Sequence, residues 1–170
     1  MLKEKKPFLR GFGYALRGLW GMVRRERHFR CHLCATYYVT AFAVLYDLER
    51  TGYAVLFVTI FLVLALETVN TVVDMKSQRH TKFGRFAKDA AAGGVLLAAV
   101  GAIGVAVSLF CHVDKLVAAW QTLIVSPGWI CVFAVPVIPC ILFIVGRKKW
   151  DKARRMNIYE NRVYFDRRAC

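Results

Sequence analysis

Residues 53–74 read YAVLFVTIFLVLALETVNTVVD, an apolar run that ends in three polar side chains, Glu67, Asn70 and Asp74. A helix needs about 20 mainly apolar residues to cross the hydrocarbon core of a bilayer, and this run is long enough. The i, i+3, i+7 spacing puts the three polar side chains on one helix face. A carboxylate at the end of a membrane span is costly unless it is paired or takes part in function, so this face is the first candidate for the functional site.

The composition points to an integral membrane protein. Hydrophobic residues make up 58% of the chain, yet the formal net charge is +14, and apolar and basic blocks alternate rather than mix. That segregation is typical of a polytopic membrane protein whose charges lie at the lipid headgroups, and it disfavours a soluble basic protein that binds nucleic acid. The predicted fold class is therefore an all-α, polytopic membrane helix bundle, with no nucleic-acid partner.

Before the quoted run, the chain predicts an amphipathic surface helix and a first span. From Leu9 to about Arg27 apolar residues recur every three or four positions, which favours a helix lying in the membrane interface or packed against the bundle. The first span is predicted from Cys31 to about Leu48, and the second from Tyr53 to about Val73.

After the quoted run come a basic loop and two further apolar segments. The loop covers residues 75–85, and the third span ends near Phe110. Small residues around Gly93-Gly94 at the start of the third span predict close helix contact there. Residues 116–125 are apolar enough to lie at the interface or to begin a span, and an additional fourth span covers 129–145, kinked by its prolines. The predicted domains are a core at 1–112, an additional interfacial or transmembrane segment at 113–146 and a basic tail at 147–170.

The distribution of basic residues predicts the orientation in the membrane. Of the 25 Lys and Arg residues, all but Arg50 and Lys115 lie in the N-terminal region, in the 75–88 stretch or in the tail. By the positive-inside rule, four spans then leave both termini in the cytoplasm of a bacterial cell membrane. Glu26, the Glu67 face and Lys88-Asp89 converge at this one membrane surface.

These groups suit phosphoryl transfer. Mg²⁺ is commonly bound by one or two carboxylates together with substrate phosphates, and Glu26 and Asp74 are the candidate ligands. Taken alone, Glu26 is also consistent with a solvated ion pair to a neighbouring Arg. Transfer further needs a cation against the phosphate oxygens and a base near the attacking hydroxyl, for which Lys88 and Glu67 are the candidates. The chain contains neither a Walker A pattern nor a kinase Gly-rich loop.

Four short motifs in chain order resemble the prokaryotic diacylglycerol kinase and undecaprenol kinase family. They are Gly13-Tyr14 with Gly18-Leu19, residues 26–32 (ERHFRCH), residues 67–71 (ETVNT) and residues 87–93 (AKDAAAG). The pattern Glu26-Arg27-x-x-Arg30-x-His32 is closer to the undecaprenol kinase branch of Gram-positive bacteria.

The resemblance implies a homotrimer of three-span subunits that uses Mg-ATP to phosphorylate a lipid hydroxyl at the cytoplasmic interface. Its motif positions imply that Glu67 is the general base, with Asn70 beside it, and that Glu26 is a metal ligand. They also imply that Lys88 and Asp89 bind phosphate and that Tyr14 lies near the nucleotide.

Two departures from the family pattern concern Asp74 and the C-terminal half. The family usually has a Glu seven residues after the base and an Asp four further on, where this chain has Asp74 and Gln78. The separation of Glu67 from Lys88 is also about four residues shorter than usual. Either Asp74 replaces the metal-binding Glu, or one helical turn is deleted and Asp74 corresponds to the later Asp. The fourth span and the basic tail are absent from the core family.

The leading functional hypothesis is an ATP-dependent lipid kinase that phosphorylates undecaprenol. The alternatives are a diacylglycerol kinase that produces phosphatidic acid and a catalytically inactive membrane adaptor of the same fold, which the departures motivate.

Overall fold

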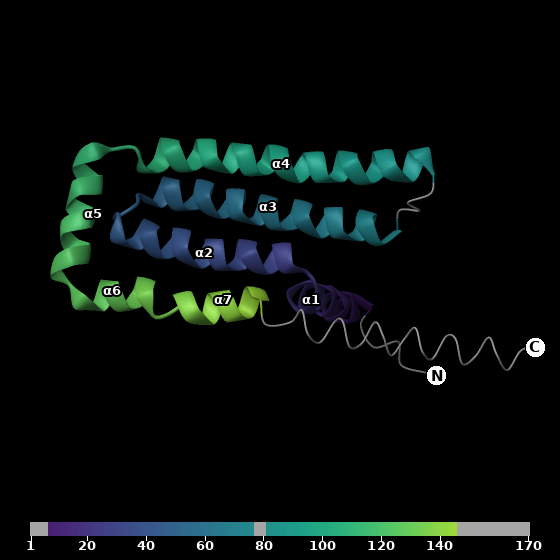
Figure 1. Ribbon diagram of the computed structural model, residues 1–170, viewed down its shortest axis with the longest axis horizontal. Coiled ribbons are helices and arrows are strands. Elements are labelled where there is room, and N and C mark those ends of the chain that lie inside the picture. Colours follow the sequence, from purple (N-terminus) through teal and green to yellow (C-terminus); the bar gives the residue numbers. More distant parts are fainter. Residues whose placement is uncertain (1–6, 77–80, 146–170) are drawn as a thin grey trace, which may run out of the picture. The chain divides into compact units, whose positions relative to one another are not determined.

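The computed structural model describes residues 7–76 and 81–145. The predicted tail and part of the predicted 75–85 loop lie outside these residues. Within the described residues all regular secondary structure is helical, as the sequence predicts (Figure 1). The helices are α1 (Pro7–Arg25), α2 (Arg27–Leu45), α3 (Arg50–Lys76), α4 (Lys82–Phe110), α5 (Val113–Val125), α6 (Pro127–Ala134) and α7 (Val137–Val145).

Helices α3 and α4 pack along each other as an antiparallel hairpin (Figure 1). Their 27 and 29 residues correspond to about 40 Å each at 1.5 Å per residue, more than the thickness of a hydrocarbon core. Helix α4 begins before the apolar run, because the Thr81 hydroxyl accepts a hydrogen bond from the Gly84 N–H at 3.0 Å and caps the helix. Helix α3 continues to Lys76 and α4 starts at Lys82, so the predicted loop at 75–85 is too long at both ends.

Three helical stretches of the described residues are long and apolar enough to cross a membrane: Arg50–Lys76, Lys82–Phe110 and Pro127–Val145. They correspond to the predicted second, third and fourth spans. Helix α2 is not among them, because Arg27, His28 and Arg30 lie in its first turn and lower its mean hydropathy. The predicted span from Cys31 to Leu48 thus stays a prediction.

Helix α2 ends three residues earlier than this predicted span. Asp47 has φ 53°, the left-handed conformation that commonly ends a helix. The Asp47 N–H donates to the Val44 carbonyl at 3.2 Å, and the Leu48 N–H donates to the Ala43 carbonyl at 3.1 Å. These two bonds form a Schellman motif, which satisfies the last carbonyls of α2 and turns the chain toward α3.

Tyr46 fixes the connection between α4 and α5 against the end of α2. Its side chain is 3% exposed, and its hydroxyl donates to the His112 carbonyl at 3.4 Å and accepts from the His112 N–H at 3.2 Å. The ring also meets Phe42 and Phe110, with centroids 5.9 and 5.2 Å away. Because both backbone groups of His112 are bonded, α5 starts from a fixed point beside α2.

Two tyrosines of α2 hold the end of α6. Pro136 has no N–H to donate to the Val132 carbonyl, and the helix is interrupted between Ala134 and Val137, as the prolines predict. The Tyr37 hydroxyl donates to the Val132 carbonyl at 3.0 Å, and the Tyr38 hydroxyl donates to the Phe133 carbonyl at 3.4 Å. Carbonyls at the break in the apolar segment thus find donors on a neighbouring helix, as buried or membrane-embedded backbone requires.

We expect Tyr37→Phe to lower the free energy of unfolding by about 0.6 kcal/mol, and by no more than about 1.7 kcal/mol, because it removes one interhelical hydrogen bond. Reversible unfolding in mixed micelles would measure the loss. Tyr53→Phe is the control, since within the described residues the Tyr53 hydroxyl makes no hydrogen bond, although its ring stacks on Phe57. Equal effects of the two variants would contradict a stabilising role of the hydrogen bond from Tyr37 to the Val132 carbonyl.

By its internal contacts the chain divides after Phe133, so that α1 to α5 and all of α6 except Ala134 belong to one unit, and Ala134 and α7 belong to the other. In the second unit the structure describes one short helix, Val137–Val145. The functional boundaries predicted at residues 112 and 146 stay predictions.

Candidate functional site

Glu67 is a buried carboxylate on the interior face of α3. The buried residues of this helix form one stripe with helical spacing, and they are Gly52, Leu56, Val63, Glu67 and Thr71. Glu67 is 4% exposed and Thr71, one turn further on, is 6% exposed. No ion pair involves Glu67 within the described residues. A carboxylate held in an apolar stripe without a counter-charge is unfavourable for folding, which favours a chemical role.

Asn70 and Asp74 continue the polar face predicted from the sequence. Asn70 is half-buried, and so is Asp74. The Asp74 carboxylate forms an ion pair with the ammonium group of Lys88, which lies on α4. The structure therefore joins two of the predicted site residues from different helices.

The Asp74–Lys88 ion pair is partly solvated. The side chains of Lys88 and Asp74 are 37% and 42% exposed. Ion pairs with this exposure typically contribute only about 0.2–1 kcal/mol to stability. The pair is thus a weak support for the fold, and its charges remain accessible to a ligand.

The ion pair also shows the register of the α3–α4 hairpin at this end. Glu67 lies two turns back from Asp74 along α3, and two turns forward from Lys88 along α4 is Val95. The Glu67 carboxylate is therefore level with the Gly93-Gly94 segment. A Cβ atom at either glycine would meet nothing within 4 Å, so among the described residues the close helix contact predicted there is not made. Both glycines are half-buried, and each leaves room for a small group.

Glu26 separates α1 from α2. Its backbone is extended, with φ −99° and ψ 120°, and its half-buried side chain makes no capping hydrogen bond. The break puts a carboxylate between the amphipathic helix and the bundle. Within the described residues no three His, Cys, Asp or Glu side chains gather as a metal cluster, and the predicted pair of ligands, Glu26 and Asp74, stays a prediction.

Tyr14 and Asp89 both have exposed side chains. Tyr14 is 66% exposed on α1, and the guanidinium of Arg17 lies 5.8 Å from its ring centroid. Asp89 is exposed on α4, one residue beyond Lys88. Within the described residues no ion pair or side-chain hydrogen bond links either of them to Glu67 or to the Asp74–Lys88 pair.

Two buried polar residues of this region, Arg30 and Thr71, were not among the predicted site residues. Arg30 is 3% exposed on α2, and one of its guanidinium N–H groups donates to the Arg24 carbonyl at 3.3 Å, which ties α2 to the end of α1. Thr71 lies buried beside Glu67. The sequence contains a signal for Thr71, because a residue four positions after Glu67 lies on the same helix face. It contains no signal for the burial of Arg30, which depends on how α1 packs.

Comparison with known proteins gives a consistent result over the first two thirds of the chain. The model of the family described as prokaryotic diacylglycerol kinase matches residues 13–110. Over 101 residues the chain is 35% identical to an undecaprenol kinase of Bacillus subtilis (strain 168), covering 57% of this chain and 82% of that protein.

A second relative is a diacylglycerol kinase of Synechocystis sp. (strain ATCC 27184 / PCC 6803 / Kazusa), 40% identical over 97 residues. The match covers 54% of this chain and 55% of the relative's length. No solved structure matches the chain. The matched range contains α2 to α4 and most of α1, with Tyr14, Glu26, Glu67, Asp74 and Lys88, and it stops before α5.

Proposed function

The chain belongs to the prokaryotic diacylglycerol kinase family, and we propose that this membrane lipid kinase phosphorylates undecaprenol. Support for this substrate comes from the Bacillus subtilis relative, of whose length the match covers 82%, compared with 55% for the Synechocystis relative. The pattern Glu26-Arg27-x-x-Arg30-x-His32 points the same way. The observation that carries the proposal is a buried Glu67 two turns from an accessible Asp74–Lys88 pair, at one end of the α3–α4 hairpin.

Glu67 is proposed as the general base. Its carboxylate accepts the proton of the lipid hydroxyl while the hydroxyl oxygen attacks the γ-phosphorus of ATP and the bond to the ADP oxygen breaks. Burial keeps water away from the carboxylate, and the space left by the missing side chains of Gly93 and Gly94 is proposed to admit part of the lipid substrate. Asn70, on the same face, is proposed to orient the hydroxyl.

Lys88 is proposed to bind a phosphate of ATP, the phosphate donor that the family implies. Its ammonium already neutralises a carboxylate, and a triphosphate offers it several anionic oxygens in exchange. Asp89 and Tyr14 are proposed to complete the nucleotide site.

The carboxylates fit a magnesium ion by donor type, because Mg²⁺ takes hard oxygen ligands and needs only one or two from the protein when phosphates supply others. Glu26 and Asp74 are the residues that would hold it. The ion would supply charge neutralisation on the phosphates.

The proposed active form is a homotrimer in the bacterial cell membrane, with both termini and the site on the cytoplasmic side. Of the 25 Lys and Arg residues, 23 lie in the N-terminal region, in the 75–88 stretch or in the tail, and only Arg50 and Lys115 lie in the connections predicted on the other side. By the positive-inside rule this distribution supports the proposed orientation. Residues 77–80 connect the two helices that carry the site, so a protease or a thiol probe applied from each side would test the orientation at that connection.

A panel of lipid alcohols tests the substrate. Full-length protein in detergent, given γ-labelled ATP and Mg²⁺, should transfer label to undecaprenol with a kcat/KM at least about tenfold higher than to diacylglycerol, because one substrate pocket discriminates between tails of different shape. A higher kcat/KM for diacylglycerol would replace the proposed substrate with the first alternative. No labelled lipid at any magnesium concentration would refute the kinase proposal.

An inactive adaptor of the same fold is the second candidate, favoured by the engagement of Lys88 with Asp74 and by the shortened Glu67–Lys88 separation. An adaptor should show no magnesium-dependent protection by ATP against limited proteolysis. A kinase should show it.

A further inference from the structure

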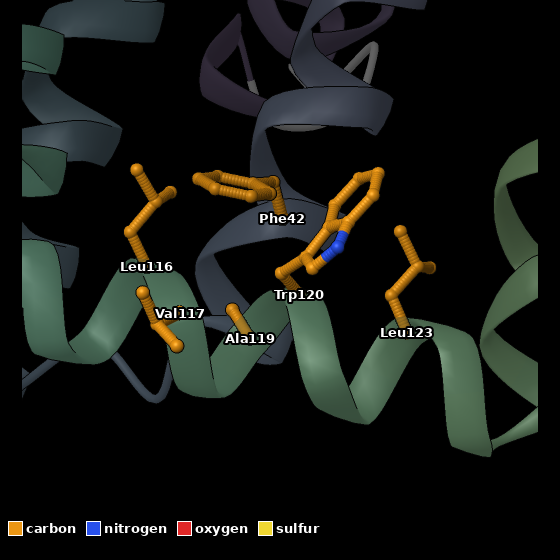
Figure 2. A pocket seen from close by; sticks show the side chains of 6 residues that line it. All are labelled: Phe42, Leu116, Val117, Ala119, Trp120 and Leu123. Atoms are coloured by element: carbon orange, nitrogen blue, oxygen red, sulfur yellow. The ribbon is translucent and has the colours of Figure 1, made fainter.

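An apolar cavity of about 400 Å³ lies between α2 and α5. Its lining is Phe42, Leu116, Val117, Ala119, Trp120 and Leu123. Figure 2 shows Leu116, Trp120 and Leu123 projecting from α5 on the side where the Phe42 ring lies. The volume falls within the roughly 300–1,000 Å³ of small-molecule sites in proteins. The indole N–H of Trp120 is the only polar group among the lining side chains.

Helix α5 has the length and pattern of an interfacial helix. Its 13 residues extend about 20 Å, too short to span a bilayer, and it begins at Val113, close after the spanning helix α4 ends at Phe110. Asp114 and Lys115 lie in its first turn. Leu116, Trp120 and Leu123 have i, i+4, i+7 spacing, so they share the face that meets α2. The cavity therefore lies where α4 leaves the hydrocarbon.

This end of the hairpin is remote from the proposed kinase site. Arg50 begins α3 near the cavity, and Asp74 lies 24 residues further along the same helix, or about 36 Å away. The family match also stops at residue 110, before any α5 residue of the lining. The cavity is thus a separate feature of this chain.

The cavity opens to the outside of the protein, and its lining is apolar. Leu116, Val117 and Trp120 are 46%, 49% and 61% exposed, so the cavity opens outward rather than into the protein. Apart from the Trp120 indole N–H, the lining side chains offer no donor or acceptor to phosphate or sugar groups, which would lose their hydration on entry. At the level where α4 leaves the membrane, the surrounding apolar molecules are lipid chains. A chain that fills the cavity gains dispersion contacts that an empty cavity lacks.

We propose that the α2–α5 cavity binds one acyl chain of a bilayer phospholipid, on the membrane side opposite the Asp74–Lys88 pair. The chain packs between Phe42 and Trp120, and the phospholipid headgroup stays at the interface beside the polar residues of α5. The bound chain joins α5 to the bundle and does not take part in phosphoryl transfer.

Photolabelling tests the site in the full-length protein. A trace of phosphatidylcholine with a diazirine near the end of one chain is added to protein in excess detergent, irradiated, and mapped by peptide mass spectrometry. Label is expected on residues 113–125 and around Phe42, and unlabelled phosphatidylcholine should compete it away. Val117→Phe fills the cavity and should lower this labelling about threefold or more.

Val125→Phe is the matched control, because Val125 is on the same helix, 79% exposed and outside the lining. It should leave the labelling unchanged. Circular dichroism checks that both variants fold, and Leu116→Phe replaces Val117→Phe if the latter does not. Label spread evenly over α3 and α4, label that does not saturate, or equal labelling of the two variants would overturn the proposal. Cross-links from α5 to a second copy in place of lipid label would overturn it too.

Discussion

Glu67→Gln should lower kcat about 100-fold or more, while the protein keeps its fold and its thermal stability does not fall. Removing a positioned general base typically costs about 10²–10⁴ in rate. The amide has nearly the shape of the carboxylate but no charge, and a buried charge without a partner is unfavourable for folding. Because Glu67 is 4% exposed and pairs with no cation among the described residues, its neutralisation should not destabilise the protein. Turnover with undecaprenol and the unfolding temperature, measured on one preparation, check both parts.

Glu49→Gln is the control for this prediction. Glu49 is on the other end of the hairpin, its side chain is 80% exposed, and it lies 3.8 Å from the ammonium of Lys115. This variant should keep wild-type kcat. If Glu67→Gln retained more than about a tenth of the activity, the proton would have another acceptor and Glu67 would lose its proposed role.

The sequence predicted the face that carries Glu67, Asn70 and Asp74 because one uninterrupted helix determines it. Their relative positions depend only on 3.6 residues per turn, which α3 obeys from Arg50 to Lys76. Local periodicity is thus enough to predict that the three side chains share a face. The burial of Glu67 is not predictable in this way, because α3 is apolar on every side and several of its large apolar residues, such as Phe57 and Phe61, are exposed.

The contact between Asp74 and Lys88 could not be predicted in the same way. The sequence placed both residues at one membrane surface, but their pairing depends on the register of two antiparallel helices. That register follows from where α4 begins, and residues 82–89 are too polar to mark a helix start by hydropathy. The start is set instead by the Thr81 cap and by packing on α3.

The role of helix α5 could not be predicted from its own residues. Thirteen mainly apolar residues are compatible both with an interfacial helix and with the start of a span, and only tertiary contacts distinguish them. Tyr46 holds the preceding residue, His112, and Ala119 is 3% exposed beside Tyr46 and Leu45. These contacts turn α5 toward the end of α2, a result that no pattern within residues 113–125 contains.

Lys88→Met should lower kcat about 100-fold, because it removes the cation proposed to face the phosphates, and loss of one such electrostatic contact typically costs about 10²–10³. Lys88→Arg keeps the charge and should retain more activity than Lys88→Met. The loss of stability should stay within about 1 kcal/mol in both, since the pair with Asp74 is partly solvated. Single-turnover kinetics with labelled ATP and an unfolding curve separate the two effects.

A charge exchange distinguishes a structural from a catalytic role of this pair. The double variant Asp74→Lys with Lys88→Asp restores an ion pair between α3 and α4 but moves the cation to the other helix. If the pair serves only to join the helices, the double variant should recover the activity lost in each single variant. If Lys88 must present its charge to a phosphate from α4, or Asp74 its carboxylate to the metal ion from α3, the double variant should recover stability and remain inactive. We expect the second result, because the pair is partly solvated and contributes little to the fold, whereas both of its groups are proposed to bind the phosphates or the metal ion.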